Sequence, residues 1–437
     1  MADGQAAAAL DGTGQMVTQA WPLSADDIDG ACARLAGVAE VSPLQRCDRL
    51  SRETGWQVYL KREDLQPVRS YKLRGAFNLM AQLPAAEKAA GVVCASAGNH
   101  AQGVAFASRR LGITARVYVP RGTPRQKRDR IAVHGGPGVE LIVTGDSYDD
   151  AAGAALADAR ASGATLVPAF DDPRTVTGQG TIAAEILAAL PAPPAAVVVP
   201  VGGGGLMAGV AAYLRERALS VLVAGAEPAG AASMTAALAA GGPVTLAEID
   251  PFVDGAAVLR AGHLPFAVIA RLGCPVVTVA EGAVCTQMLA LYQNEGIIAE
   301  PAGALAAAAL SQPGPLAGLP AGAVVVVVVS GGNNDVSRYG EVIERSLVHC
   351  GLKHYFLVEF AQQPGALRRF LDDVLGPDDD ITLFEYVKRS NRETGPALVG
   401  VELGSADGLE PLLARMKASP MRTEQLSPGT PAYSYLT

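Results

Sequence analysis

The sequence predicts an α/β protein with a parallel sheet that is buried on both faces, followed by a small α+β module. Short runs rich in Val and Ile alternate with longer Ala- and Leu-rich segments, which is the pattern of successive βα units. The most apolar run, Ala323–Val329, is far shorter than the ~20 residues of a membrane-spanning helix and therefore indicates a buried strand. After His349 the alternation changes to a compact βαββα series, which is typical of a ferredoxin-like module.

The first part of the chain contains most of the predicted elements, which alternate in order. The predicted strands are Trp56–Lys61, Gly91–Ala95, Ala115–Val119, Val139–Val143, Ala196–Val201, Val221–Ala226, Pro275–Val279 and Ala323–Val329. The predicted helices are Asp27–Leu35, His100–Leu111, Pro124–Val133, Ser147–Ala161, Gly178–Ala189, Leu206–Ala218 and Gly282–Gln293. Ser24 precedes the first of these helices and is expected to cap it.

In the C-terminal module the same patterns predict five elements. They are a strand at His354–Phe360, a helix at Pro364–Leu375, strands at Ile381–Lys388 and Ala397–Leu403, and a helix at Gly408–Lys417. A chain of 437 residues is longer than one ordinary domain of roughly 100–200 residues. We therefore expect a flexible N-terminus over residues 1–23, a large domain over 24–348 and a small domain over 349–437.

Composition and charge exclude several classes of function. The formal net charge is −8 with acidic and basic residues interspersed, so neither nucleic acid nor a membrane surface is an expected partner. The six cysteines include no CxxC pair and suit reduced thiols better than a disulfide framework or a structural zinc site. The N-terminus lacks the cationic start and apolar run of a secretory signal, so a cytoplasmic location is expected.

A glycine run joins a predicted strand to a predicted helix at Val201–Leu206. Gly202, Gly203, Gly204 and Gly205 carry no side chains, so their backbone N–H groups can approach an anion closely at the start of the helix. Phosphate binding is the leading interpretation, and a tight turn without a ligand is the alternative.

The identity of that phosphate is open on these residues alone. Gly203, Gly205 and Ala208 fit the G-x-G-x-x-A form of the dinucleotide fingerprint, and Glu227 ends the next strand where a ribose-binding acid belongs. An NAD-dependent dehydrogenase is therefore a competing hypothesis. Its weakness is that several βα units precede the fingerprint, which usually lies on the first βα turn.

Two further loops follow predicted strands. Ser96, Ala97, Gly98 and Asn99 precede a helix, where exposed N–H groups and the amide of Asn99 can hold a carboxylate. Ser330 follows the most apolar strand and lies where open α/β sheets bind their ligands. Either loop taken alone could be an ordinary turn.

Five stretches in order resemble one known family. SYKLRGA, SAGNHAQGVA, VGGGGLMAGV, EPAGA at Glu300–Ala304 and SGGNN match the pyridoxal-phosphate enzymes of fold type II, and are most similar to the threonine deaminases (threonine ammonia-lyases). The C-terminal module resembles the ACT-like regulatory domain of the short biosynthetic form. The resemblance implies a catalytic region of two open twisted α/β subdomains plus this domain.

The resemblance also implies roles for individual residues. Lys72 would form the Schiff base with pyridoxal 5'-phosphate and act as the general base, Asn99 would bond the 3′-oxygen of the ring, and Ser330 would contact the ring nitrogen. Gly202, Gly203, Gly204, Gly205 and Leu206 would enclose the phosphate, and Ser96, Ala97, Gly98, Asn99 and His100 would clasp the substrate carboxylate. Tyr71 is interpreted as a packing residue and Arg74 as a member of a structural ion pair, while His100 has a second interpretation as an ordinary helix N-terminal residue.

The implied reaction is deamination of L-threonine to 2-oxobutanoate and ammonia, the committed step of isoleucine biosynthesis. The resemblance also implies feedback by isoleucine, opposed by valine, at the turn of Pro364, Gly365 and Leu367, and a homotetramer or homodimer. Glu227 is a candidate for a monovalent cation site. Serine as a substrate, a serine dehydratase and a serine racemase of the same fold are the alternatives.

Overall fold

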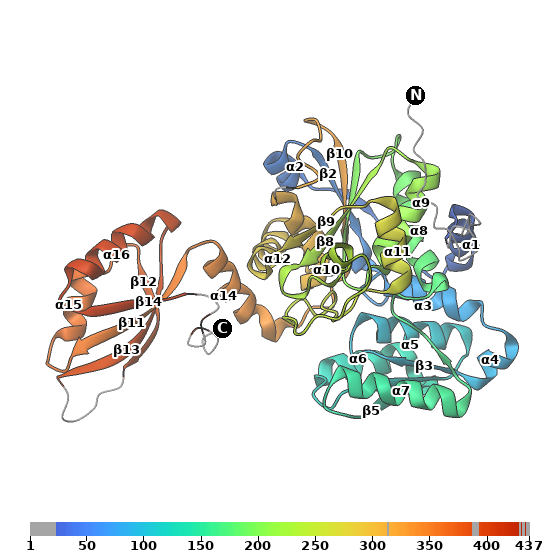
Figure 1. Cartoon of the computed structure of the whole chain (residues 1–437), viewed down its shortest axis with the longest axis horizontal. Helices are drawn as coiled ribbons and strands as arrows, with labels where there is room; N and C mark the ends of the chain where they lie inside the picture. Colours follow the sequence, from blue (N-terminus) through green and yellow to red (C-terminus); the bar gives the residue numbers. More distant parts are fainter. Residues whose placement is uncertain (1–22, 313, 387–392, 428–429, 431–432, 434–437) are drawn as a thin grey trace.

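The computed structural model describes residues 23–312, 314–386, 393–427, 430 and 433. The predicted flexible N-terminus lies outside the described residues except for Leu23. Among the described residues, the strands form a six-stranded sheet and two four-stranded sheets. In Figure 1 the larger sheet and its helices occupy the upper right, one small sheet lies below it, and the other lies at the left, where α14 (Tyr339–His349) leads to it.

The six-stranded sheet has the order β1-β2-β10-β7-β8-β9. Its strands are β1 (Leu44–Arg46), β2 (Gln57–Arg62), β7 (Ala196–Pro200), β8 (Leu222–Pro228), β9 (Val276–Val279) and β10 (Val324–Val329). Only the β1–β2 pair is antiparallel; the other neighbours are parallel. The predicted parallel sheet is thus confirmed, and β1 is an antiparallel edge strand that the sequence analysis did not predict.

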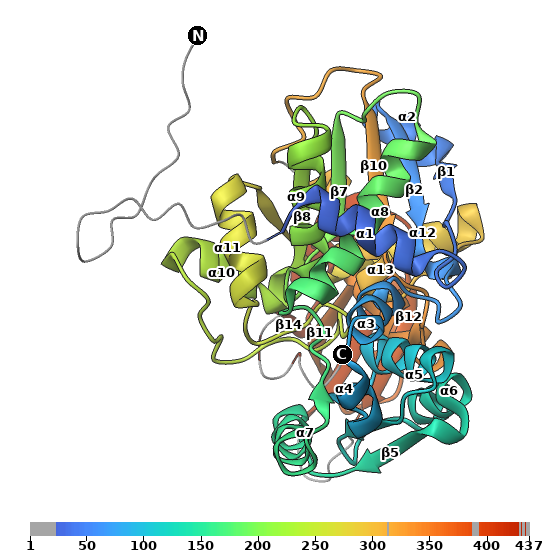
Figure 2. The same cartoon turned by 90° about the vertical axis from the view of Figure 1, so that its right-hand side faces the viewer.

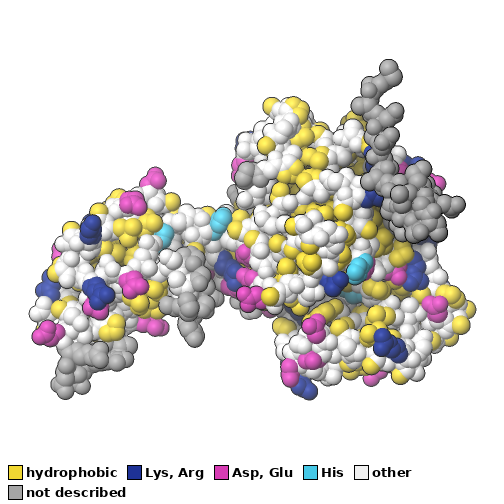
Figure 3. Space-filling model, viewed as in Figure 1, with side chains coloured by type: hydrophobic (Ala, Val, Ile, Leu, Met, Phe, Trp, Pro, Cys, Tyr) yellow, Lys and Arg dark blue, Asp and Glu magenta, His cyan; other side chains and the backbone are white. Residues whose placement is uncertain are grey.

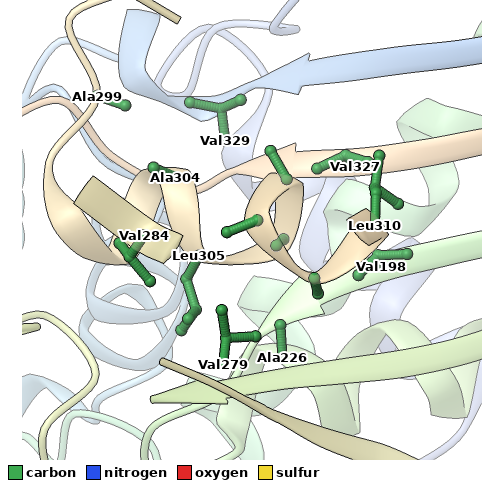
Figure 4. Packing of buried hydrophobic residues seen from close by; sticks show 14 of the residues in the cluster. Val198, Ala226, Val279, Val284, Ala299, Ala304, Leu305, Leu310, Val327 and Val329 are labelled. Atoms are coloured by element: carbon green, nitrogen blue, oxygen red, sulfur yellow. The ribbon is translucent and has the colours of Figure 1, made fainter. Parts of the chain in front are cut away.

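Helices cover both faces of this sheet, which explains the uninterrupted valine run of β10. Val325, Val327 and Val329 pack with α12 (Glu281–Glu295) and α13 (Pro301–Ala308) on one face, as Figure 4 shows for Val327 and Val329. Val326 and Val328 point to the opposite face. That face is covered by α1 (Ala25–Leu35), α8 (Pro173–Ala189), α9 (Gly205–Arg217), α10 (Ser233–Ala240) and α11 (His263–Leu272).

The second sheet is fully parallel, with the order β5-β4-β3-β6. Its strands are β3 (Val92–Ala95), β4 (Ala115–Val119), β5 (Val139–Val143) and β6 (Thr165–Leu166). Its helices are α4 (Ala85–Ala90), α5 (Asn99–Leu111), α6 (Arg125–Gly135) and α7 (Tyr148–Ser162). The six-stranded sheet with its helices forms one body, and this parallel sheet with its helices forms a second. In both views α3 (Lys72–Ala81) lies where the two bodies meet, in contact with α5 and α8 (Figure 1, Figure 2).

The C-terminal sheet is antiparallel with the order β12-β13-β11-β14. Its elements are β11 (Lys353–Ala361), α15 (Ala366–Asp373), β12 (Asp380–Tyr386), β13 (Thr394–Glu402), α16 (Leu409–Ala418) and β14 (Arg422–Leu426). The ferredoxin-like prediction is confirmed, with β14 as a sixth element that was not predicted. Val387 and Lys388, the last residues of one predicted strand, lie outside the described residues.

Most predicted boundaries agree with the structure within two residues, but α8 begins five residues earlier than predicted. Asp172 accepts a hydrogen bond from the backbone N–H of Arg174, and Pro173 occupies the first helical position. The prediction also omitted α2 (Asp48–Thr54), α3, α4, α10, α11, α13 and α14. The first helix is confirmed, and Ser24 caps it together with Asp27.

Positive and negative side chains are interspersed on the face shown in Figure 3. No large field of one sign is visible there, in agreement with the charge pattern of the sequence. A search of the described part of the chain for helices with the length and hydropathy to cross a bilayer found none.

Candidate active site

The predicted loops lie at the carboxyl ends of parallel strands. Gly202 follows β7 and Ser330 follows β10 in the six-stranded sheet, whereas Asn99 follows β3 in the small parallel sheet. Lys72 is the first residue of α3, which joins the two bodies. Open α/β sheets bind their ligands at such edges. The arrangement therefore defines one candidate site between the two parallel sheets.

Lys72 is held among groups from three other segments. Its Nζ donates to the carbonyl of Ala169 over 3.2 Å and lies 5.2 Å from the ring centre of Tyr71. The N–H of Tyr71 donates to the carbonyl of Ser330. A Cβ on Gly103 of α5 would lie 3.0 Å from the Lys72 carbonyl carbon, so α5 passes directly against the start of α3. Tyr71 packs against the sheet core, as predicted.

The glycine run is enclosed by protein on one side and offers N–H groups on the other. A Cβ on Gly202 would lie 2.8 Å from the carbonyl oxygen of Ala256, and one on Gly203 would lie 2.3 Å from the ring of Phe170. Gly204 has a φ of +89°, which favours glycine. Within the described residues, the N–H groups of 202–206 have no hydrogen-bond partner, and α9 begins at Gly205. This is the anion cradle of a helix N-terminus.

Substitution of Gly203 by alanine tests the close approach of Phe170. The new Cβ would overlap three atoms of the ring, so the ring and the loop must move apart. We expect a loss of about 1–3 kcal/mol in the free energy of unfolding and weaker phosphate binding. Chemical denaturation measures the first quantity, and titration with pyridoxal phosphate measures the second.

Gly153→Ala is the matched control, because Gly153 lies within α7 and has open space around its Cβ position. That variant should be as stable as the unmodified chain or more stable, because alanine favours a helix over glycine. A Gly203→Ala protein that behaves like the control would contradict the packing argument.

Asn99 lies in a polar chain that crosses between the two bodies. Its Nδ2 donates to Glu300 Oε1 over 2.6 Å, and its Oδ1 accepts from Asn333 Nδ2 over 2.7 Å. Asn333 in turn accepts from Arg130 of α6 over 2.9 Å. Asn99 is thus fixed in one orientation. Ser330 is buried nearby, and its hydroxyl donates to the carbonyl of Ala302 over 3.1 Å.

Glu300 is buried, and the pKa of its carboxyl group is raised. Burial raises the pKa of Glu300 to about 7, the carboxylate of Asp254 adds to this shift, and the hydrogen bond from Asn99 opposes it. The folded chain therefore binds a proton at Glu300 more tightly than the unfolded chain, in which the ordinary value is 4.5.

A Glu300→Gln variant should change how stability depends on pH. A raised pKa contributes stability that is present below the unfolded value and is lost as pH rises through the folded value. From pH 5 to pH 8, the unmodified chain should therefore lose about 2–3 kcal/mol of unfolding free energy relative to the variant. Chemical denaturation at pH 5, 6.5 and 8 checks this. A constant difference between the two proteins would show that Glu300 does not titrate in this range.

Ser96, Ala97, Gly98 and His100 form the loop before α5 and its first turn. Ser96 Oγ accepts from the N–H of Gly98, and the first N–H groups of α5 point out of the helix end. The His100 ring bonds the carbonyl of Val167 through Nε2 over 2.8 Å. Burial, together with the charge of Lys72, lowers the pKa of His100 to about 4. The ring is therefore neutral and holds the loop before α8, whereas a substrate role would fall to the backbone N–H groups.

Arg74 belongs to a buried ion network, as the sequence analysis favoured. Its guanidinium donates to Glu63 over 2.8 Å and to Glu185 over 2.6 Å. Lys61 also pairs with Glu185 over 2.5 Å. Arg74 is 1% exposed, so it is anchored away from solvent while Lys72, two residues earlier, reaches Ala169.

Glu227 is buried at the end of β8, and its two oxygens accept from the N–H groups of Met234 and Thr235 at the start of α10. Both oxygens of this carboxylate are thus used to cap a helix, which removes the support for the NAD interpretation. In the part of the chain that the structure describes, no group of three or more His, Cys, Asp or Glu side chains could hold a metal ion. The monovalent cation stays a prediction.

In the C-terminal domain, Pro364 and Gly365 are exposed at the turn between β11 and α15, and Leu367 is exposed in the first turn of α15. Gly365 has a φ of +84° and is the N-terminal cap residue of α15. These residues therefore lie together at one exposed helix start, where the N–H of Ala366 donates to the carbonyl of Gln363.

Sequence reasoning assigned no role to several residues that build the site. Ala169 and Phe170 lie in the loop before α8, where Phe170 packs on Gly203 and Ala169 accepts from Lys72. Glu300 and Asn333 belong to the matched stretches EPAGA and SGGNN, so a signal for them existed, but only coordinates join them to Asn99.

The residues fit pyridoxal phosphate on two structural observations. The unpaired N–H groups of 202–206 suit a phosphate, and the helix dipole of α9 adds to their attraction. Lys72 supplies a primary amine, and Phe170 on Gly203 links the phosphate cradle to the Ala169 carbonyl that this amine contacts.

Comparisons with known proteins agree with this site. The family model of the pyridoxal-phosphate dependent enzymes matches residues 36–331, and that of the C-terminal regulatory domain of threonine dehydratase matches 344–436. The chain is 66% identical over 416 residues to the biosynthetic L-threonine dehydratase IlvA of Mycobacterium bovis, covering 95% of this chain and 96% of the relative.

Two solved structures are similar over most of their own length. The processed form of threonine deaminase isoform 2 from Solanum lycopersicum is 38% identical, with a TM-score of 0.68, covering 74% of this chain and 94% of that one. Maize serine racemase is 29% identical, with a TM-score of 0.69, covering 75% and 99%.

Proposed function

The chain belongs to the pyridoxal-phosphate dependent enzymes and, within them, to the biosynthetic L-threonine dehydratases, and we infer that it deaminates L-threonine to 2-oxobutanoate and ammonia. It is a carbon–nitrogen lyase of isoleucine biosynthesis with a regulatory domain. The observation that carries this inference is the position of Lys72 beside the phosphate cradle.

The residues that would hold pyridoxal phosphate come from both bodies. The N–H groups of 202–206 would bind the phosphate, Asn99 would bond the ring oxygen, and the hydroxyl of Ser330 would contact the ring nitrogen. When bound, the cofactor supplies an electron-withdrawing ring that stabilises negative charge at the α-carbon of an amino acid. Ser330 would offer this nitrogen a neutral hydroxyl and no carboxylate, so it would not hold a proton on the ring, which favours elimination.

Lys72 is the residue that we assign to proton transfer. Its Nζ would take the proton from the α-carbon of threonine, which activates loss of the β-hydroxyl. The N–H groups at the start of α5, with Ser96 Oγ close by, would hold the substrate carboxylate. Glu300 and Asn333 bond the two ends of the Asn99 amide and so would hold it in the orientation that faces the ring oxygen.

Regulation and assembly form part of the same proposal. Isoleucine, opposed by valine, would bind at Pro364, Gly365 and Leu367, where the helix start offers N–H groups to a carboxylate. The catalytic domain would span residues 24–348 and the regulatory domain 349–437. The active form would be a homotetramer or homodimer in the cytoplasm, with L-serine as a second substrate.

Release of 2-oxo acid from threonine and serine tests this function directly. The purified protein should be yellow, should release 2-oxobutanoate from threonine with the higher kcat/KM, and should be inhibited by isoleucine. Chiral analysis of the serine reaction tests the racemase alternative, which the similarity to maize serine racemase favours. A colourless protein without 2-oxo acid release would contradict the proposal, and D-serine as the main product would support the alternative.

A further inference from the structure

The loop of residues 250–256 is held from one side by the helix that leads to the C-terminal domain. The guanidinium groups of Arg338 and Arg345 lie over the buried ring of Phe252, 4.8 Å and 4.4 Å from its centre. Arg338 also donates to the carbonyl of Phe252 over 2.8 Å, and Arg345 donates to Asp250 over 3.0 Å. Arg338, at the N-terminal cap of α14, and Arg345 within it thus fix the ring, a carbonyl and a carboxylate of one loop.

The other side of the same loop touches the candidate site at several points. The backbone of Ala256 lies against Gly202, and a Cβ on Gly255 would lie 3.5 Å from Glu300 Oε1 and 3.9 Å from Asn99 Nδ2. Asp254 pairs with Lys127 of α6 over 2.5 Å. The 250–256 loop therefore lies between α14 and the phosphate cradle and contacts both.

The same helix also holds the first strand of the C-terminal domain. Glu344 accepts from Tyr355 Oη over 2.5 Å and from Lys353, both on β11. Glu344 directly precedes Arg345 in α14, so one turn of this helix contacts both the C-terminal sheet and the 250–256 loop.

We propose that Phe252 is a positioning residue for the phosphate cradle, and that Arg338, which directly precedes α14, and Arg345 within α14 hold it in place. The ring anchors the loop so that Ala256 supports the backbone of Gly202 and Gly255 stays beside Asn99 and Glu300. Loss of the anchor lets the cradle widen and weakens its hold on a phosphate. The proposal rests on the proposed function only in taking this phosphate to be that of the cofactor.

Cofactor titration of the apoprotein tests the proposal. The variants are Phe252→Leu, which keeps an apolar side chain without a ring face, and Arg345→Gln. Each should raise the Kd for pyridoxal phosphate about 5–10-fold, measured by visible absorbance. At saturating cofactor, each should lower kcat for threonine and leave KM within about two-fold, because the substrate carboxylate is held elsewhere. The double variant should bind no more weakly than Phe252→Leu, since both changes act through one ring.

Arg116→Gln is the matched control. Arg116 of β4 pairs with Asp158 of α7, and its side chain is 24% exposed, compared with 25% for Arg345. It should leave the cofactor Kd unchanged. The proposal is overturned if Arg345→Gln binds the cofactor as tightly as the unmodified chain, or if Arg116→Gln weakens binding equally.

A failure of the proposed function can be distinguished from a failure of the Phe252 proposal, because the unmodified protein would then bind the cofactor without releasing 2-oxobutanoate. The Kd comparison remains decisive in that case. A role confined to stability would lower the unfolding midpoint of Arg345→Gln and leave its Kd unchanged, which also counts against the proposal.

Discussion

A Lys72→Ala variant should release 2-oxobutanoate from threonine at least about 1,000-fold more slowly than the unmodified chain. The expected loss is large because one amine both attaches the cofactor and moves the proton at the α-carbon. Lys72 Nζ is directed to the Ala169 carbonyl beside Phe170 and the phosphate cradle, whereas Lys61, the buried lysine of the same region, is committed to Glu185 and Ser42. Turnover at saturating threonine and added pyridoxal phosphate measures the effect.

Two controls connect this loss to the amine itself. Lys72→Arg keeps the positive charge but offers no primary amine, so it should be as inactive as Lys72→Ala. Borohydride reduction of the unmodified protein, followed by peptide mass analysis, should place the cofactor on the peptide that contains Lys72. A label on Lys61 or Lys127, or full turnover by Lys72→Ala, would overturn the assignment.

The sequence predicts the parts of the site that depend on local backbone. Loops after the predicted strands carry Asn99, Gly202 and Ser330, and the structure has all three at strand ends. Small residues at such ends are a local signal, since only they allow backbone N–H groups to be exposed. The alternation of apolar runs likewise predicts a parallel sheet, because strands buried on both faces are uniformly apolar. Its division into two sheets was implied only by the family resemblance.

What remained unpredicted depends on contacts between distant segments. Phe170 packs on Gly203 from 33 positions earlier in the chain, and Glu300 meets Asn99 from 201 positions later. No local pattern records such a pairing. The start of α3 also carries no local signal, because Tyr71 provides no side-chain cap for this helix. The cap of α8 was missed because Asp172 and Pro173 resemble an ordinary turn.

An Arg74→Met variant should lose about 3–5 kcal/mol in the free energy of unfolding. Burial alone would raise the pKa of Glu63, but the charge and hydrogen bonds of Arg74 hold it below its ordinary value. Methionine fills the volume and leaves Glu63 charged and buried, with Ser42 Oγ and the more distant Lys61 as its remaining support. Urea denaturation at pH 7 measures the loss. Arg217→Met, which removes an exposed pair with Asp26 and Asp29, should change the midpoint little.

The pH dependence of the unfolding free energy distinguishes loss of the ion pair from loss of packing. A lowered carboxyl pKa contributes stability that is present above the unfolded value and is lost as pH falls through the folded value. Without Arg74, burial raises the pKa of Glu63 in the folded variant, so Glu63 is charged at pH 7 and takes up a proton as pH falls toward 4.5. The deficit of Arg74→Met should therefore shrink over this range. Glu63→Gln added to Arg74→Met should recover part of the stability at pH 7, because the uncompensated charge is gone. A deficit that is equal at both pH values, with no recovery in the double variant, would mean that Arg74 acts by packing α3 on α8 and that its charge contributes little.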